Sequence, residues 1–157
     1  MEKNDYVQFF HDKPEESVGF LFWQINSLWQ QKMNKSLKEL NLTLVEFILL
    51  SGVAWLERFK EPLTQIKLAK HAKKNVMMTS KVIRILETKK LIQRRTHDAD
   101  TRAKCIYITS EGKEKVKIAL KLVKTVDEEF FSPVVNSEED FIKNLSIILL
   151  RNSKKIS

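Results

Sequence analysis

The scarcity of glycine and proline restricts the fold of this chain more than any other feature, because 157 residues contain only three of each. All-β folds and Rossmann-type folds need many tight turns, and these two residues supply much of the backbone geometry of such turns. The sequence therefore predicts a mainly helical chain. Its length and its hydrophobic content of 43% suit a single domain with a sizeable core.

Membrane, metal and catalytic functions have little support in the sequence. No apolar run approaches the roughly 18 residues of a membrane span, and the first residues lack a signal-peptide pattern. We therefore expect a cytoplasmic protein with no membrane partner. The single cysteine, Cys105, allows no intramolecular disulfide, and His11, His71 and His97 show no metal-ligand spacing. We accordingly expect no metal, no cofactor and no catalytic residue.

Positive charge is concentrated in the middle of the chain. The segment Lys67–Lys104 contains twelve of the 28 Lys and Arg residues but only three of the 20 Asp and Glu residues. The formal net charge of +8 therefore comes from this segment. A basic module of this kind favours an acidic partner such as nucleic acid. From the charge alone, a solvated lysine surface without a partner is an equally good interpretation.

Apolar spacing predicts two long helices at the start of the chain. Apolar residues three and four positions apart indicate an amphipathic helix over Glu15–Leu40. Thr43 and Glu46 form a capping-box pattern at the start of a second helix. The apolar run that follows, as far as Trp55, predicts that this second helix lies deep in the core.

Two shorter helices are expected next. The first covers Gln65–Ala72, with Ile66 and Ala69 facing the core, and Asn75 then caps a helix that ends near Thr88. In this capped helix the spacing assigns a buried stripe to Thr79, Val82, Ile83 and Leu86. The side chains that must then point away from the core are Met77, Ser80, Lys81 and Arg84.

A β-hairpin and two further helices complete the expected fold. Strand character over Leu91–Arg95 and Cys105–Ile108, with a polar tip between them, indicates the hairpin. Helical spacing returns over Ser110–Phe131, and Pro133 ends it. A last helix begins near Ser137, where acidic residues in its first turn meet the positive end of the helix dipole. The predicted fold class is mainly α with a small β-hairpin wing.

This order of elements is the layout of a winged helix-turn-helix. An α-helix fits the major groove of B-DNA, and lysines around it can neutralise phosphates. An arginine at the hairpin tip can enter the minor groove, whose negative potential attracts guanidinium groups. Arg102 is suited to this role because Asp98 and Asp100 lie close enough in sequence for one of them to orient it.

Several motifs in this region have a characteristic order: Leu63-Thr64-Gln65, Leu68-Ala69, Thr79-Ser80-Lys81-Val82, Leu91-Ile92-Gln93-Arg94, Asp98-Ala99-Asp100-Thr101-Arg102-Ala103-Lys104 and Ile108-Thr109-Ser110-Glu111-Gly112. Together they resemble the MarR-type transcriptional regulators, most specifically in the wing string followed by Thr-x-x-Gly. The resemblance implies one domain over residues 1–157, with dimerisation helices in 1–42 and 110–157 and a DNA-binding part in 43–109.

The resemblance also implies which residues contact DNA. It implies base contacts by Met77, Met78, Ser80 and Lys81, and a minor-groove contact by Arg102. The whole set of predicted DNA contacts is Thr64, Gln65, Met77, Met78, Ser80, Lys81, Arg84, Arg95, Arg102 and Lys104, with Asp98 and Asp100 orienting the wing arginine.

Some of these positions have a second interpretation. Met77 and Met78 could be core residues, since methionine packs adaptably. Arg84 could form only an ion pair with Glu87 one turn later. Cys105, in a wing strand, is better explained as a small buried hydrophobic residue than as a redox sensor. The family usually has a glycine at the position of Lys90, where a left-handed backbone costs lysine about 1 kcal/mol.

The resemblance implies that the terminal helices interlock two protomers. The apolar segments at the two ends of the chain are Phe9-Phe10, the first helix, Phe130-Phe131, Val134-Val135 and Phe141–Leu150. If they did not fold back over their own core, a monomer would expose an unusually large apolar patch. We therefore expect a homodimer that binds double-stranded DNA at a palindromic operator, as a repressor. A small aromatic or anionic effector is a further candidate partner, in a pocket lined by Phe20, Phe22, Trp23 and Trp29.

Other function classes stay open at this point. A winged helix can bind protein or RNA without reading bases, and a steep salt dependence of duplex binding would distinguish DNA binding from that alternative. An enzyme that uses Cys105 and His97 would need an orienting group and an oxyanion site, and the sequence suggests neither. A membrane-surface helix is disfavoured because the lysines do not lie opposite one apolar face. The prediction is a non-enzymatic, DNA-binding transcriptional regulator.

Overall fold

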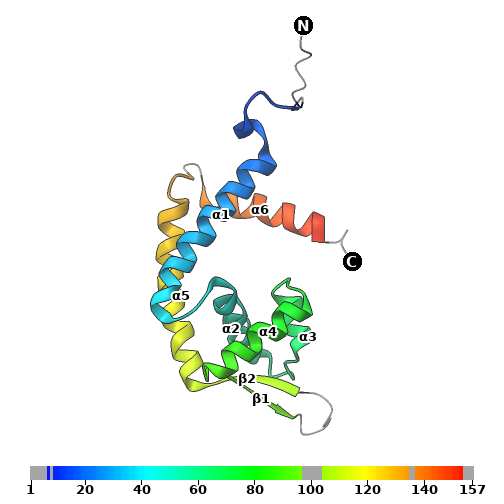
Figure 1. Ribbon diagram of the computed structural model, residues 1–157, viewed down its shortest axis with the longest axis vertical. Coiled ribbons are helices and arrows are strands. Elements are labelled where there is room, and N and C mark those ends of the chain that lie inside the picture. Colours follow the sequence, from blue (N-terminus) through cyan, green and yellow to red (C-terminus); the bar gives the residue numbers. More distant parts are fainter. Residues whose placement is uncertain (1–6, 8, 97–103, 135–136, 154–157) are drawn as a thin grey trace.

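The computed structural model describes residues 7, 9–96, 104–134 and 137–153 of the chain (Figure 1). Its elements, in chain order, are η1 (Pro14–Glu16), α1 (Val18–Leu37), η2 (Lys38–Leu40), α2 (Leu44–Leu56), η3 (Glu57–Phe59), α3 (Gln65–His71), α4 (Val76–Thr88), β1 (Ile92–Thr96), β2 (Lys104–Ile108), α5 (Ser110–Phe131) and α6 (Glu138–Ser153). The mainly helical fold with one hairpin is confirmed.

Side-chain caps determine where most of these helices begin. The hydroxyl oxygen of Thr43 accepts from the backbone N–H of Glu46, and the Glu46 carboxylate accepts from the N–H of Thr43, which completes the predicted capping box. Asn75 and Ser137 cap α4 and α6 in the predicted way, through the N–H groups of the third residue after each. Each cap satisfies a backbone donor that has no partner inside the helix.

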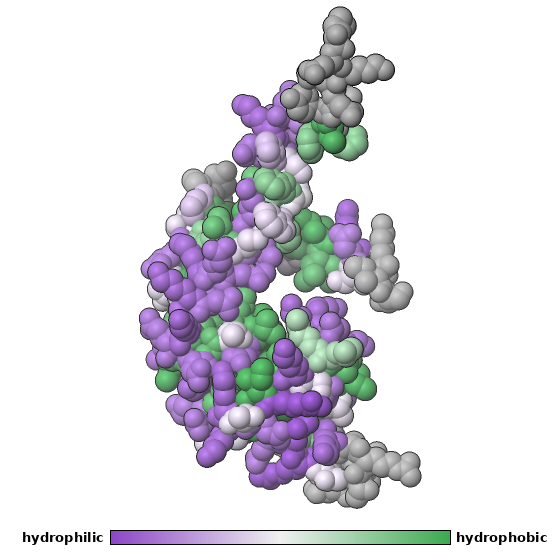
Figure 2. Space-filling view, in the orientation of Figure 1, coloured by the Kyte–Doolittle hydropathy of each residue, from purple (hydrophilic) through white to green (hydrophobic). Residues whose placement is uncertain are grey.

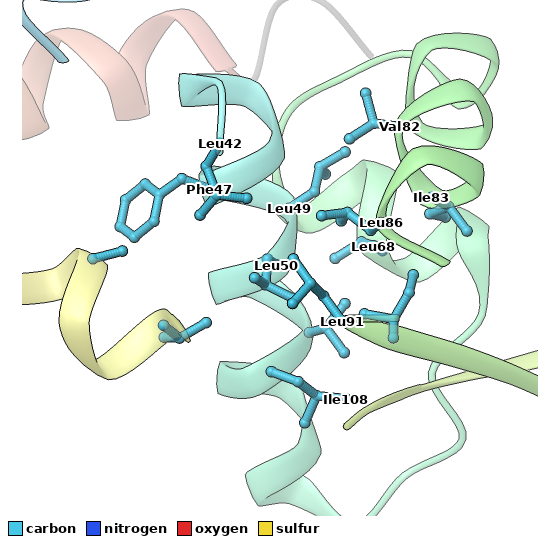
Figure 3. Close-up of a cluster of buried hydrophobic side chains, with 14 of the residues drawn as sticks. Leu42, Phe47, Leu49, Leu50, Leu68, Val82, Ile83, Leu86, Leu91 and Ile108 are labelled. Atoms are coloured by element: carbon cyan, nitrogen blue, oxygen red, sulfur yellow. The ribbon is translucent and has the colours of Figure 1, made fainter. Parts of the chain in front are cut away.

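The core lies around α2, which supplies several of the most deeply buried side chains (Figure 3). Leu49, Leu50 and Val53 on α2 are at most 1% exposed. They pack with Leu68 of α3, with the predicted stripe of α4, and with Leu91 and Ile108 at the base of the hairpin. Burial of each such side chain stabilises the fold by about 1.5–3 kcal/mol. The core therefore holds α3, α4 and the hairpin together as one body.

The predicted inward positions of two apolar residues are wrong. Trp55 on α2 is 51% exposed and Ile66 on α3 is 68% exposed. Ile66 precedes the buried Leu68 by two residues, about 200° around a helix, so that burial of Leu68 turns Ile66 outward. Trp55 has the same offset from Val53, and the guanidinium of Arg58 lies over its ring at 4.6 Å.

The hairpin is antiparallel, with Ile92 opposite Ile108 and Thr96 opposite Lys104. Strand β1 begins one residue later than predicted, because the N–H of Leu91 still closes the turn that follows α4. The N–H of Leu91 donates to the carbonyl of Leu86 at 3.0 Å, and Lys90 has the left-handed backbone with φ 59°. This is the helix ending that normally takes glycine, so Lys90 adopts the strained conformation that the sequence indicated.

The helices α1 and α5 lie side by side and extend away from the hairpin, and α6 lies at the far end of this pair (Figure 1). The indole N–H of Trp29 on α1 donates to Asp127 on α5 at 2.8 Å. In α6, by contrast, none of the residues from Glu138 to Ser153 is buried. This last helix therefore does not fold back over the core.

Within the described residues, no single helix has the length and apolar character of a membrane span. Two neighbouring segments, Val18–Leu40 and Leu44–Phe59, reach these limits only when taken together, and they meet at a bend of 71°.

Candidate nucleic-acid interface

The turn between α3 and α4 is held by backbone and side-chain contacts. Lys73 takes a left-handed conformation with φ 52°, and the N–H of Lys74 donates to the carbonyl of Ala69 at 3.0 Å. The amide Nε2 of Gln65, at the start of α3, donates to the carbonyl of Val76 at 3.4 Å. These contacts give α4 a defined direction relative to α3.

The exposed face of α4 carries the stripe that the sequence predicted. Met77 is 85% exposed, Lys81 and Arg84 are exposed, and Ser80 is half-buried. With Ile85, these side chains line a shallow hollow of about 430 Å³ on the surface of the helix. Met77 is therefore not a core residue. Met78 is 43% exposed, so the core interpretation does not hold for it either.

Arg94, and not Arg84, is the partner of Glu87. The Nε and Nη2 atoms of Arg94 donate to the Glu87 carboxylate at 3.0 and 2.5 Å. The hydrogen bond from Arg94 holds the pKa of Glu87 below its ordinary value, and the same bond raises the pKa of Arg94. This pair fastens β1 to α4. Arg84 has no acidic partner among the described residues, so the alternative interpretation of Arg84 as an ion-pair partner of Glu87 does not hold.

The part of the wing that the structure describes also presents basic residues. The guanidinium of Arg95 lies over the Tyr107 ring at 5.8 Å and donates to the side-chain oxygen of Gln93 at 3.0 Å. Lys104 is exposed at the start of β2. The predicted tip residues Asp98, Asp100 and Arg102 lie outside the described residues.

Hydrophilic side chains gather around the hairpin end of the molecule, whereas hydrophobic ones show along α6 (Figure 2). The wing is tied to this end because the N–H of Ile106 donates to the carbonyl of Leu63 at 2.9 Å. Thr64, the next residue, caps α3 by accepting from the N–H of Lys67 at 3.3 Å. Thr64 and Gln65 thus lie close to the start of α4 and to the wing. Both side chains form hydrogen bonds within the protein, Thr64 with the N–H of Lys67 and Gln65 with the carbonyl of Val76.

The Thr-x-x-Gly motif has a structural reason at the junction of the wing with α5. The hydroxyl of Thr109 lies 2.8 Å from the carbonyl of Lys90 and 3.0 Å from that of Leu91, and its oxygen accepts from the N–H of Gly112. A Cβ atom on Gly112 would lie 2.1 Å from the Leu91 carbonyl oxygen. Only glycine permits this close approach. The motif therefore joins the base of the wing to α5.

Sequence reasoning missed a polar link between α4 and the rest of the molecule. Lys89 Nζ, at the end of α4, donates to both carboxylate oxygens of Glu46 at 3.1 and 3.0 Å and to the carbonyl of Asn41 at 2.6 Å. Glu46 is only 5% exposed. Asn34 of α1 extends the link by accepting from the N–H of Leu44. The capping box drew attention to Glu46, but no local pattern connects it with a lysine 43 positions later.

Other candidate chemistry has no support in the described residues. Cys105 is completely buried, as expected of a small hydrophobic residue. Within the part of the chain that the structure describes, no three His, Cys, Asp or Glu side chains lie together in a way that could hold a metal ion.

Comparisons with known proteins agree with this geometry. The model of the family "Transcriptional regulator SarA/Rot" matches residues 31–118, which is more than half of the chain. The chain belongs to this family. An uncharacterised HTH-type transcriptional regulator of Bacillus subtilis, YdcH, is 39% identical over 136 residues, which are 87% of this chain and 92% of that protein.

Solved structures share the fold. The S. aureus MepR–DNA complex superimposes with a TM-score of 0.74 at 24% identity, over 92% of this chain and 100% of that one. CouR from Rhodococcus jostii RHA1, bound to p-coumaroyl-CoA, gives 0.75 at 19% identity, over 88% and 93%. The reduced form of MarR from E. coli gives 0.69 at 20% identity, over 85% and 96%. The resemblance to MarR-type regulators is confirmed at the level of the fold. The protein is a DNA-binding transcriptional regulator of the winged helix-turn-helix type.

Proposed function

We propose that this regulator reads a palindromic operator as a homodimer and represses transcription from it. The observation that carries the proposal is the stripe of α4 that faces away from the core, in which Met77, Lys81 and Arg84 are exposed and Ser80 is half-buried. Because one side of α4 is packed in the core and the other side is exposed and basic, the exposed side can enter the major groove while the rest of the fold stays intact. Residues 43–109 form the DNA-binding part in this proposal.

The predicted contacts divide by position. Met77, Met78, Ser80, Lys81 and Arg84 would face base edges or nearby phosphates from α4. Arg95 and Lys104 would contact phosphates beside the wing, and Thr64 and Gln65 would approach the backbone at the start of α3. Arg102 would enter the minor groove, held in orientation by Asp98 or Asp100.

The assignment of base contacts to α4 is tested by comparing the affinities of wild-type and variant proteins for a duplex selected from the genome of the source organism. Lys81→Ala should weaken binding by about 1–3 kcal/mol and relax the base preference, because a lysine that reads a base edge discriminates between bases. Lys117→Ala is a matched control, since Lys117 is exposed on α5 and pairs only with Glu114 among the described residues. An unaltered base preference in Lys81→Ala would contradict the assignment.

The wing assignment has its own test. Arg102→Ala should lower both the affinity and the slope of log K against log salt, the slope by about one phosphate's worth. Asp100→Ala should cause part of the same loss through misorientation of Arg102. If Arg102→Ala bound DNA with wild-type affinity and the wild-type salt slope, Arg102 would not contact DNA and the wing would be only a structural connection between α4 and α5.

The dimer is proposed from surface that a single chain leaves uncovered. Apolar residues of α6 that are 39–63% exposed are Ile142, Leu145, Ile147, Ile148, Leu149 and Leu150, and α1 adds Val18, Phe22, Trp23 and Leu28 at 55–82%. A two-fold pair through residues 1–42 and 110–157 would cover this surface. Two recognition helices about 34 Å apart would then fit successive major grooves.

Repression is proposed because a dimer on its operator excludes other proteins from the same DNA. Deleting the gene should therefore raise transcription from promoters that overlap the selected sites, and a fall would indicate an activator. An effector that releases the DNA is a further part of the proposal, supported by the ligand in the CouR structure. Phe20, Phe22 and Trp23 are 37–62% exposed, so a pocket at these rings would need the partner protomer.

A further inference from the structure

The exposed stripe of α4 lacks the side chains that read adenine. Asn and Gln recognise adenine by two hydrogen bonds to its major-groove edge. Neither occurs between Val76 and Thr88, a helix that the structure describes in full. The two nearest amides are already engaged, since Asn75 accepts from the N–H of Met78 at 2.7 Å and Gln65 donates to Val76.

The first turn of α4 is instead apolar and exposed. Val76, Met77 and Met78 are 44%, 85% and 43% exposed. Acidic residues are common in the first turn of a helix because they interact favourably with the positive end of the helix dipole. The first turn of α4 contains none. Three consecutive apolar side chains therefore stand in water at the end of the helix that leads into the groove.

We propose that Met77 recognises thymine through its C5-methyl group, so that A·T pairs of the operator are read by apolar contact rather than by hydrogen bonds. This inference rests on the proposed function, in which α4 occupies the major groove. The thymine methyl is the one apolar group that a base pair presents there. Lys81 and Arg84, further along the same stripe, supply donors for the acceptor edge of guanine.

The shape of the surface fits this role. Met77 and Ile85 supply apolar walls to the shallow hollow on α4, and Ser80, Lys81 and Arg84 complete its lining. Methionine is unbranched and polarizable, so that its side chain can adjust its conformation to pack against a methyl group. Burial of a methyl group in such a contact strengthens binding by about fourfold at 25 °C.

The experiment compares thymine with uracil, which keeps every hydrogen-bonding group and lacks only the methyl. The full-length protein selects duplexes from a random library, and the selected duplex is prepared with dT or with dU at each A·T position in turn. Wild-type protein should bind the dU duplex about fourfold more weakly at each position that Met77 contacts. Met77→Ala should bind the dT and dU duplexes equally at those positions, because its side chain no longer reaches the methyl.

The comparison of variants separates a contact with Met77 from a change in the DNA itself. A weakening by dU that arises from DNA flexibility persists in Met77→Ala, whereas a methyl contact does not. Met77→Leu should keep the preference for dT, since leucine is also large and apolar. Equal binding of dT and dU duplexes by wild-type protein, or a preference unchanged in Met77→Ala, would overturn the inference alone. Failure to retain any duplex would overturn the proposed function as well.

Discussion

The two ends of the molecule differ in how completely one chain covers its own apolar side chains. At the hairpin end, α2, α3, α4 and the two strands surround a core in which Leu49, Leu68 and Leu86 are fully buried. At the opposite end, α6 buries no residue, although it presents six large apolar side chains. The first end can hold its shape alone, whereas the second needs another surface to cover it.

This difference assigns the two ends to different tasks. In the proposed function α4 enters DNA and must keep its direction, and the core and polar contacts around α4 provide that rigidity. In the proposed dimer, an uncovered helix such as α6 would be stabilised by association, which would link its folding to dimerisation. The contrast can be tested by disturbing each end separately.

The largest effect is expected at α6. Replacing both Leu145 and Leu149 by Glu should convert a dimer into a monomer at micromolar concentration, because four charges would lie in the apolar interface of the pair. Sedimentation measures the mass, and Asn144→Glu is the control that adds charge to the same helix at a polar, exposed position. A wild-type protein that is monomeric with DNA bound would refute the proposed dimer.

A smaller effect is expected within the hairpin end, at the ion pair between α4 and α2. Lys89→Ala should lower the free energy of unfolding by about 2–3 kcal/mol, because it leaves the buried carboxylate of Glu46 without its cation. The control Lys67→Ala breaks an exposed pair with Glu61, which is worth less than about 1 kcal/mol. Urea titration measures both variants. Equal losses of unfolding free energy in the two variants would mean that the buried Lys89–Glu46 pair stabilises the fold no more than an exposed ion pair does.

The end of α4 should respond in the stabilising direction. Lys90→Gly should raise the free energy of unfolding by up to about 1 kcal/mol, since glycine adopts the left-handed conformation at φ 59° without the cost that lysine bears. The gain is limited because glycine is also more flexible in the unfolded chain. Thermal unfolding measures the change, and a loss of stability would show that the Lys90 side chain contributes contacts of its own.

The smallest effect concerns pH and the Glu87–Arg94 pair. Because pairing lowers the pKa of Glu87 below its ordinary 4.5, the pair stabilises the folded state above pH 4.5, and this contribution is lost as pH falls through the lowered pKa. Wild type should therefore exceed Glu87→Gln in stability at pH 7 by less than about 1 kcal/mol, since the pair is partly exposed. The two should converge as the pH falls below 4.5, and a difference that stays constant until the protein unfolds in acid would exclude this cause.

Local patterns predicted most of the elements because their causes lie within a few residues of one another. The caps at Thr43, Asn75 and Ser137 act on N–H groups three positions later, so that sequence alone locates these helix starts. The buried stripe of α4 follows in the same way from helical periodicity. The outward side of Met77, Lys81 and Arg84 was predictable for the same reason.

Pairing between distant residues was not predictable from such patterns. Helical spacing offered only Arg84 as a partner of Glu87, but the turn at Lys90 brings Arg94 of the next strand to it. Ile66 looked buried by its hydrophobicity, but the short helix α3 has room for only one buried side, which Leu68 and Ala69 occupy. In both cases the outcome depends on how elements pack.

The sequence by itself determined the order of helices and strands, their caps, the basic middle segment and the exposed side of α4, because each depends on spacing along a short stretch of chain. Only the tertiary structure decided that Lys89 closes on Glu46, that Gly112 lies against the Leu91 carbonyl, and that α6 stays uncovered. These features depend on which surfaces meet after the chain has folded, and residues far apart in sequence carry no local signal of that meeting.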